Sequence, residues 1–210
     1  LCCRRIMKRV IFAVIVAAAF WFVMFSPWMR DHVNFWVTMA CAGVTLILMS
    51  AFWGRDFKNQ FSFSMKDILI GVGSAVVLYG VFYLGDFFSK LLFDFAQDQV
   101  ANIYLLKEGE NEWHLALLLI LLIGPAEEIF WRGYVQRMLE PKYGVWAALV
   151  ITVLVYTLVH IWSFNFMLIM SALVCGAFWG LLYTYKKNLA TLIISHALWD
   201  VSVFVLFPII

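Results

Sequence analysis

Six ionisable side chains fall inside segments that are apolar enough to lie in a membrane. They are Glu127, Glu128, Arg132, His160, His196 and Asp200. Each charge placed in a bilayer costs a few kcal/mol on insertion scales, so such residues usually face one another or a water-filled cavity. All six lie after residue 113, and this concentration favours a functional cavity over a polar cluster that only ties helices together.

Two adjacent glutamates precede an arginine in the stretch PAEEIFWRGYVQ, residues 125–136. On a helix, Glu128 and Arg132 are four residues apart, so they share a face and can form an ion pair. Glu127 is rotated by about 100° from Glu128 and is left without that partner. We therefore expect a structural ion pair at Glu128 and a free carboxylate at Glu127 that faces His160 across a cavity.

The two later histidines each have a polar neighbour one helical turn away. Tyr156 precedes His160 by four residues, and Asp200 follows His196 by four residues, so each pair shares a helix face. Counted from the expected cytoplasmic ends of their helices, Glu127, His160 and His196 lie at depths of roughly 15, 22 and 10 Å. These depths agree within about two helical turns, so the count permits the three side chains to meet.

These residue types can activate water. A free carboxylate and a neutral imidazole near one water molecule polarise it for attack on a carbonyl, and a second histidine can stabilise the oxyanion that forms. Ser195 is adjacent to His196 and points away from it by about 100°, which disfavours a serine nucleophile. A zinc site of His160, His196 and a carboxylate stays open at this point, because two imidazoles and one carboxylate form a catalytic zinc set.

The elements that must position these residues are membrane helices. The 210 residues are 65% hydrophobic and 13% charged, whereas a soluble domain is about half apolar and about a quarter charged. A helix needs about 20 apolar residues to cross a bilayer, and helices are the spanning solution for runs without strand-like alternation. Seven such segments are expected at Val10–Phe25, Val33–Trp53, Ile68–Leu84, Trp113–Met138, Val145–Trp162, Phe166–Tyr185 and Leu189–Phe207. The predicted fold is an all-α, polytopic membrane protein with about seven transmembrane helices and a polar cavity in the C-terminal half.

Basic residues predict the orientation of these helices. One set of loops carries Arg4, Arg5, Lys8, Arg9, Arg55, Lys58, Lys66, Arg137, Lys142, Lys186 and Lys187. The opposite set holds Arg30, Lys90 and Lys107. The positive-inside rule then predicts a multi-pass protein of the cell (plasma or inner) membrane with a cytoplasmic N-terminus. Residues 85–112 lie on the outer side as an amphipathic segment, either as an extension of the third helix or as a helix on the surface.

Three short motifs resemble those of the CAAX protease and bacteriocin-processing family, also called CPBP or Abi. EEIFWRG resembles the family's EExxxR motif. YTLVH resembles FxxxH, with Tyr156 in place of Phe, and HALWD resembles HxxxN/D, with Asp200 in the variable last position. The resemblance covers roughly residues 113–207. It divides one integral membrane domain into residues 1–112, with three helices and the outer segment, and residues 113–210, with the catalytic helices.

The resemblance implies an intramembrane endopeptidase. Glu127 would be the base that activates water and His160 its partner, and His196 and Asp200 would lie on the oxyanion side. A carboxylate cannot donate to an oxyanion unless it is protonated, so Asp200 could instead orient His196. The supporting residues would be Glu128, Arg132 and Tyr156. Family members are often labelled metalloproteases, but a glutamate-activated water accounts better for these residues, so we predict no cofactor, with zinc as the less favoured alternative.

The predicted substrate is a peptide or a membrane-anchored protein, cut near the cytoplasmic side. The lipid bilayer is the other partner, and no nucleic acid is expected. The family is associated with prenylated CAAX substrates, but no residue in this sequence indicates that a lipid is recognised. The alternative function is a non-catalytic immunity or scaffold protein, or a small transporter that uses the buried polar cluster. A single cavity shared by Glu127, His160 and His196 would favour the peptidase over that alternative.

Overall fold

The computed structural model describes residues 2–54 and 57–209, with side chains described from Arg4 onward; Arg55, one of the basic loop residues, lies outside this part. The described residues form helices and no strand. The helices are α1 (Cys2–Phe25), α2 (Phe35–Trp53), α3 (Met65–Leu92), α4 (Ala96–Tyr104), α5 (Glu112–Leu118), α6 (Gly124–Glu128), α7 (Arg137–Tyr143), α8 (Val145–Val159), α9 (Phe166–Lys186) and α10 (Leu189–Val201).

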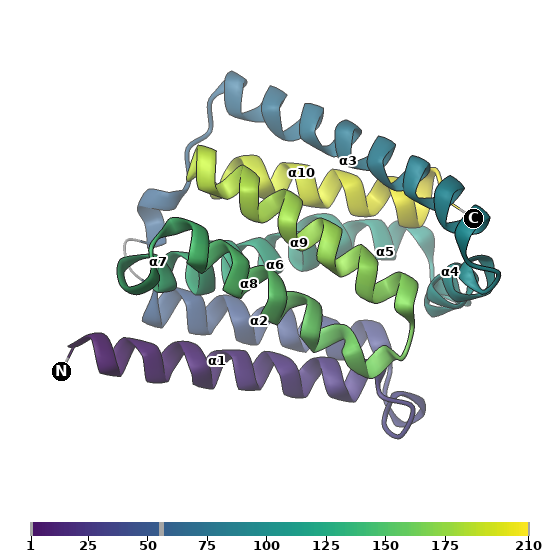
Figure 1. Cartoon of the computed structure of the whole chain (residues 1–210), viewed down its shortest axis with the longest axis horizontal. Helices are drawn as coiled ribbons and strands as arrows, with labels where there is room; N and C mark the ends of the chain where they lie inside the picture. The colour runs from purple at the N-terminus through teal and green to yellow at the C-terminus, as the bar shows by residue number, and fades with distance from the viewer. Residues whose placement is uncertain (1, 55–56, 210) are drawn as a thin grey trace.

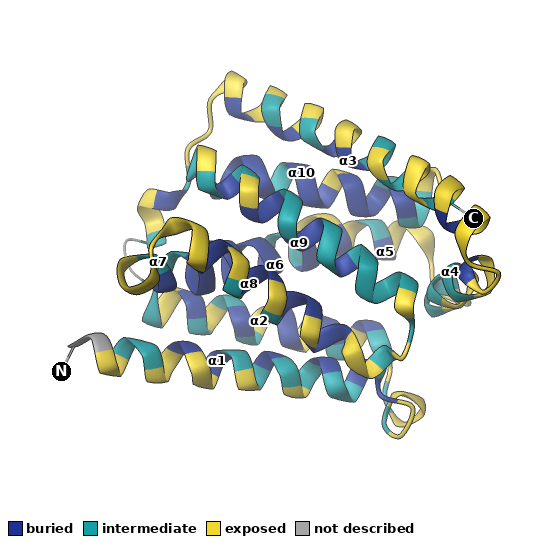
Figure 2. Ribbon diagram, in the orientation of Figure 1, coloured by how far each residue is buried: buried dark blue, intermediate teal, exposed yellow. Residues whose placement is uncertain are grey.

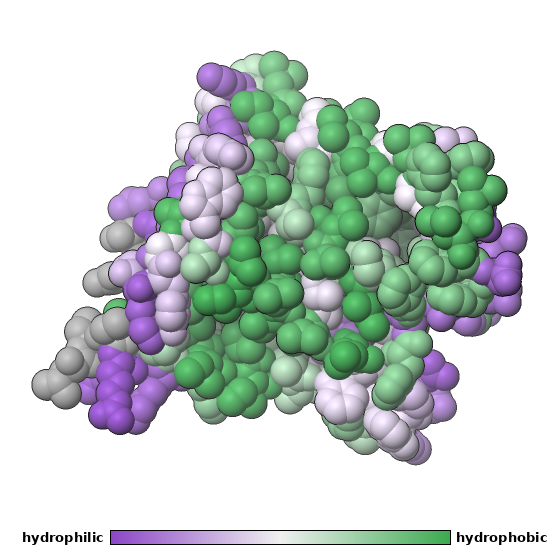
Figure 3. Space-filling view, viewed as in Figure 1, coloured by the Kyte–Doolittle hydropathy of each residue, from purple (hydrophilic) through white to green (hydrophobic). Residues whose placement is uncertain are grey.

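Seven spans in the described part of the chain are long and apolar enough to cross a membrane, which confirms the predicted polytopic all-α fold. They are Arg4–Phe25, Phe35–Trp53, Met65–Leu92, Glu112–Tyr143, Val145–Ser163, Phe166–Lys186 and Leu189–Leu206. They lie roughly along one direction, with α1 beside α2 and α3 beside α10 (Figure 1). Hydrophobic side chains form a broad band between more polar ends (Figure 3), the distribution that a bilayer requires.

The fourth span, Glu112–Tyr143, is a composite helix. Two π-helical segments, Leu119–Ile123 and Ile129–Gln136, separate α5, α6 and α7. The first π segment ends just before Gly124 and Pro125, where proline cannot donate the usual backbone hydrogen bond. π-helical turns occur often at functional sites. Here they flank the short helix α6, which carries both adjacent glutamates and is mostly buried in the middle of the bundle (Figure 2).

α3 runs along α10 at the side of the bundle. Gly71 allows this approach, because a Cβ atom there would lie 2.9 Å from Cβ of Ile194. The outward face of α3 is strongly exposed (Figure 2), with Leu69 at 64% and Val76 at 67% exposure. These side chains suit contact with lipid rather than with water.

Residues 85–112 contain both structures that their periodicity allowed, namely an extension of the third helix and a separate helix. α3 continues to Leu92, and after a break α4 forms a separate short helix. Gln99 of α4 accepts from the backbone N–H of Met167 at 3.1 Å, and the hydroxyl of Tyr104 donates to the carbonyl of Val203 at 2.9 Å. Burial raises the pKa of the Tyr104 phenol, so it stays a donor. α4 is thereby held across the ends of α9 and α10.

Candidate active site

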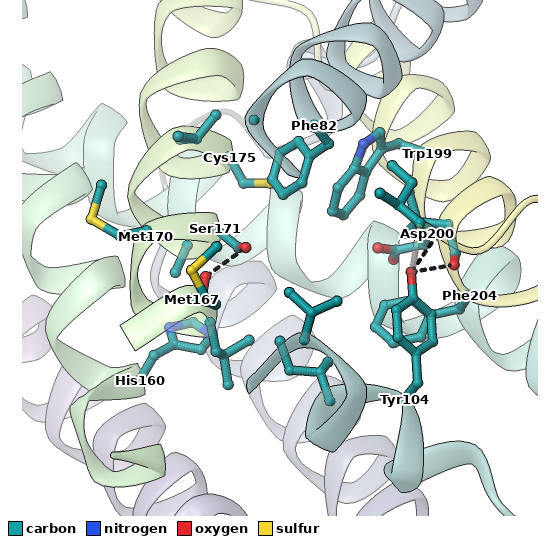
Figure 4. A pocket seen from close by; sticks show the side chains of 18 of the residues that line it. Phe82, Tyr104, His160, Met167, Met170, Ser171, Cys175, Trp199, Asp200 and Phe204 are labelled. Carbon is teal, nitrogen blue, oxygen red and sulfur yellow. Dashed lines mark hydrogen bonds between the residues drawn. The ribbon is translucent and has the colours of Figure 1, made fainter. Parts of the chain in front are cut away.

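One cavity of about 510 Å³ collects the four residues predicted to be catalytic. Glu127 comes from α6, and His160 begins the 3₁₀ turn that follows α8. His196 and Asp200 come from α10. In Figure 4, His160 and Asp200 lie on opposite sides of the cavity. Because Glu127, His160 and His196 line the same cavity, the arrangement is the one that favours the peptidase over a scaffold.

Glu127 has a partner that was not expected for it. Its Oε2 accepts a hydrogen bond from the hydroxyl of Tyr156 at 2.8 Å. The carboxylate was expected to face His160, but the structure pairs it with Tyr156, which precedes His160 by one helical turn. Glu127 is 7% exposed and still lines the cavity. The phenol therefore holds one carboxylate oxygen of Glu127 at the cavity wall.

Both ring nitrogens of His160 are occupied. Its Nδ1 lies 2.8 Å from the backbone oxygen of Tyr156, and its Nε2 lies 2.9 Å from Nε1 of Trp21. A carbonyl oxygen accepts and an indole N–H donates, so Nδ1 carries the hydrogen and Nε2 accepts. These contacts fix one neutral tautomer of the imidazole.

Trp21 is a site residue that the sequence reasoning missed. It lies on α1, is 1% exposed, and lines the cavity with its ring edge-on to His160, at 5.8 Å between centroids. In the sequence it is one aromatic residue in an apolar run, AAAFWFVMF, and nothing in its spacing distinguishes it from lipid-facing neighbours. Its partner lies 139 residues away, so no local pattern could reveal the contact.

Glu128 and Arg132 form the ion pair that their spacing predicts. Nη1 of Arg132 lies 2.8 Å from Oε1 of Glu128, and both side chains are buried. The other terminal nitrogen, Nη2, donates to the backbone oxygens of Cys175 and Gly176 at 3.3 Å each. The pair thus joins the fourth span to α9 and leaves the arginine with several acceptors inside the bundle.

The same carboxylate oxygen of Glu128 also holds His196. Nδ1 of His196 lies 2.7 Å from Oε1 of Glu128, whereas its Nε2 lies 3.6 Å from Oδ2 of Asp200. The short hydrogen bond of His196 is therefore the one that Glu128 accepts, and Asp200, which was suggested to orient His196, lies farther away at the other ring nitrogen. The imidazole also stacks on the ring of Trp179 at 3.7 Å between centroids, with an interplanar angle of 17°. A hydrogen bond and a stacked ring together fix its orientation.

The side chains do not fit the zinc alternative. A zinc site of His160, His196 and a carboxylate needs one free nitrogen on each ring. In this conformation Nε2 of His160 accepts from Trp21, so a metal ion would first have to displace the indole. In the described part of the chain, no three His, Cys, Asp or Glu side chains are grouped so that they could hold a metal ion.

The cavity lies toward α4. Its lining comes from the last residues of α1 and α8, the first residues of α9 and the C-terminal part of α3, together with α4 itself. The basic loops lie at the other ends of these helices, where Tyr134 and Tyr183 are large buried side chains. The cavity therefore lies at the end away from the basic loops, whereas cleavage was expected near the cytoplasmic side.

Residues 109–202 match the family model described as type II CAAX prenyl endopeptidase Rce1-like. This match, together with the three motifs, supports an intramembrane protease of the CAAX protease and bacteriocin-processing family. The matched family consists of peptide hydrolases of the CAAX-protease type, which supports an intramembrane endopeptidase in general. The comparisons with curated proteins and with solved structures gave no match. Trp21 and the part of α3 that lines the cavity lie outside the matched residues.

Proposed function

We propose that this protein hydrolyses a peptide bond in a peptide or membrane-anchored protein, with Glu127 as the base that activates water. The observation that carries this proposal is the hydrogen bond from Tyr156 to Oε2 of Glu127 at the cavity wall. This bond orients the carboxylate and leaves Oε1 to accept a proton from a water molecule. A base must lie within hydrogen-bond reach of the proton that it abstracts, and a cavity-lining carboxylate meets that condition.

The hydrolysis then proceeds in two proton transfers. Glu127 takes a proton from water as the water oxygen attacks the substrate carbonyl, and a tetrahedral oxyanion forms. The protonated Glu127 gives this proton to the leaving amine as the peptide bond breaks. The products are a carboxylic acid and an amine, and the carboxylate of Glu127 is restored.

His196 is proposed as the group that stabilises the oxyanion. As an imidazolium it donates Nδ1–H to Glu128, and its Nε2–H is left to donate to the developing negative charge. Glu128 and Trp179 support this role because they hold the ring before substrate arrives. Asp200, which is 3.6 Å from Nε2, provides negative charge beside that imidazolium.

His160 is proposed to bind the second hydrogen of the attacking water through Nε2. The donor now at that nitrogen is the indole N–H of Trp21, so the water must displace it. Trp21 thus occupies the position of the water in the substrate-free site. No metal ion or other cofactor takes part in this scheme.

The identity of the substrate can be tested in cells. We propose comparing the peptides of cells that carry the native protein with those of cells that carry Glu127→Gln, in which the side chain keeps its shape but loses its basicity. The expected result is a set of membrane-associated fragments that is present with the native protein and absent with the variant. Identical peptide sets at equal protein levels would contradict a role for Glu127 in hydrolysis.

A further inference from the structure

The rim of the cavity is apolar and lies at the side of the bundle. Residues that line the cavity and are also exposed define this rim. On α3 these include Val81 at 43%, Phe88 at 55% and Leu92 at 72% exposure, and on α9 Phe166 is 41% exposed. Exposed side chains of this size and kind are favourable against lipid and costly against water. The opening therefore lies between α3 and α9 and faces the membrane (Figure 3).

α4 covers the end of the cavity. Its residues Val100, Ile103 and Tyr104 belong to the lining. The contacts of Gln99 with α9 and of Tyr104 with the end of α10 hold the helix in place. A chain that reaches the catalytic residues must then come from the side, between α3 and α9, rather than straight from the water beyond α4.

The charges differ between the two ends of the bundle. The basic loops all lie at the end away from the cavity, and the α4 end carries the acidic residues Asp94, Asp98, Glu108, Glu110 and Glu112 with Arg30, Lys90 and Lys107. By the positive-inside rule, the basic end is cytoplasmic. The cavity and its rim are then in the half of the membrane that faces away from the cytoplasm.

We propose that the substrate enters laterally from the non-cytoplasmic leaflet, between α3 and α9, and that it is an exported or membrane-anchored polypeptide with an apolar segment in that leaflet. The cavity fits this occupant because its lining is mainly apolar, with many Phe, Trp, Leu and Met side chains, and continues to the catalytic residues. The cleavage of this substrate rests on the peptidase function proposed above, whereas the side of access rests on the fold and on the charges.

Thiol labelling tests the side of access without any need for catalysis. In a chain whose native cysteines are replaced, Ser171→Cys places a thiol on the cavity wall. Glu110→Cys and Asn59→Cys mark the α4 end and the basic end, since both positions are exposed. An impermeant thiol reagent is added to sealed right-side-out vesicles. We expect labelling at positions 171 and 110 and protection at position 59. Labelling of Ser171→Cys only in inverted vesicles, or in neither kind, would overturn the proposed access.

A second experiment tests the lateral entrance through hydrolysis. Val81→Trp narrows the rim, and Val76→Trp is the matched control because Val76 is 67% exposed on the same helix and does not line the cavity. The probe is a library of internally quenched peptides with a palmitoyl anchor, added to right-side-out vesicles. We expect Val81→Trp to lower hydrolysis by about tenfold or more, because a misplaced substrate reacts poorly, and Val76→Trp to leave it unchanged.

Equal hydrolysis by the two variants, or hydrolysis of the probe only in inverted vesicles, would contradict the proposed lateral entrance between α3 and α9. The outcomes also separate the two proposals. If the wild-type protein hydrolyses no probe from either side while position 171 is labelled as expected, the peptidase function as proposed fails and the side of access stands.

Discussion

Glu128 and His196, which are 68 residues apart in the chain, share a 2.7 Å hydrogen bond between Oε1 and Nδ1. The same oxygen receives Nη1 of Arg132 at 2.8 Å. One buried carboxylate therefore holds both the cation of the fourth span and the histidine of α10. The two adjacent glutamates have different surroundings: Glu128 connects helices, and Glu127 lines the cavity.

Substitution of Glu128 by Gln should lower the amount of folded protein as well as hydrolysis. It leaves the buried Arg132 without its carboxylate and weakens the hold on His196. Loss of one partner of a buried ion pair typically costs about 3–5 kcal/mol. The control is Glu140→Gln, since Glu140 pairs with Lys187 in a partly exposed ion pair worth about 0–1 kcal/mol. Thermal melting in detergent measures the stability of both variants. Equal melting temperatures for the two would argue against the structural role of the Glu128 ion pair.

Tyr156→Phe restores the residue that the family motif has at this position and removes the donor to Glu127. A hydrogen bond to a charged group contributes about 1.5–3 kcal/mol, so we expect hydrolysis to fall by roughly tenfold to a hundredfold. The control is Tyr183→Phe, which removes the hydroxyl bonded to Gln60 at the end of the bundle with the basic loops. It should reduce stability slightly and leave the rate per folded molecule unchanged. An equal loss of rate in both variants would mean that Tyr156 does not act through Glu127.

Trp21→Phe should keep hydrolysis at or above the wild-type rate while lowering the melting temperature. The substitution removes the N–H that competes with water at Nε2 of His160. A buried acceptor left unsatisfied costs about 1–3 kcal/mol. Trp131→Phe is the matched control, because its indole N–H has no hydrogen-bond partner in the described part of the chain. That substitution removes ring contacts, including those with Trp21 and Tyr156, but no hydrogen bond. A Trp21→Phe variant that melts normally but is inactive would show that the indole itself takes part in the reaction.

How much of the fold can be predicted from the sequence depends on the type of interaction that fixes each part of it. Membrane helices are predictable because the bilayer sets their length and polarity, and the seven expected segments end within a few residues of the spans, apart from α3. α3 extends beyond its apolar part to Leu92, with an ion pair of Asp86 and Lys90 at 2.8 Å in its last turns, and it ends at the cap residue Phe93.

Within the site, contacts one helical turn apart were predictable and contacts between distant helices were not. The Glu128–Arg132 pair follows from a spacing of four residues. The bonds from Trp21 to His160 and from Tyr156 to Glu127 depend on how α1, α6 and α8 pack, and spacing along the chain does not encode that packing. For the same reason, the direction in which the cavity opens could not be derived from depth counts alone.

Metal removal should leave hydrolysis unchanged. Both ring nitrogens of His160 have protein partners, so a metal ion would have to displace them. We expect purified active protein to keep its rate after treatment with a chelator and to contain far less than one zinc per chain by elemental analysis. Loss of activity on chelation, with recovery on addition of zinc, would make His160 and His196 ligands instead.

The most direct test of the account is the rate of hydrolysis by purified Glu127→Gln, measured together with its melting temperature. The amide keeps the shape of the side chain and can still contact Tyr156, so folding should be close to that of the wild-type protein. It cannot accept a proton from water, and loss of a general base typically reduces the rate by about 10²–10⁴-fold. The account predicts that loss in a preparation that melts normally. A well-folded Glu127→Gln that cleaves at a near-native rate would contradict the assignment of Glu127 as the base.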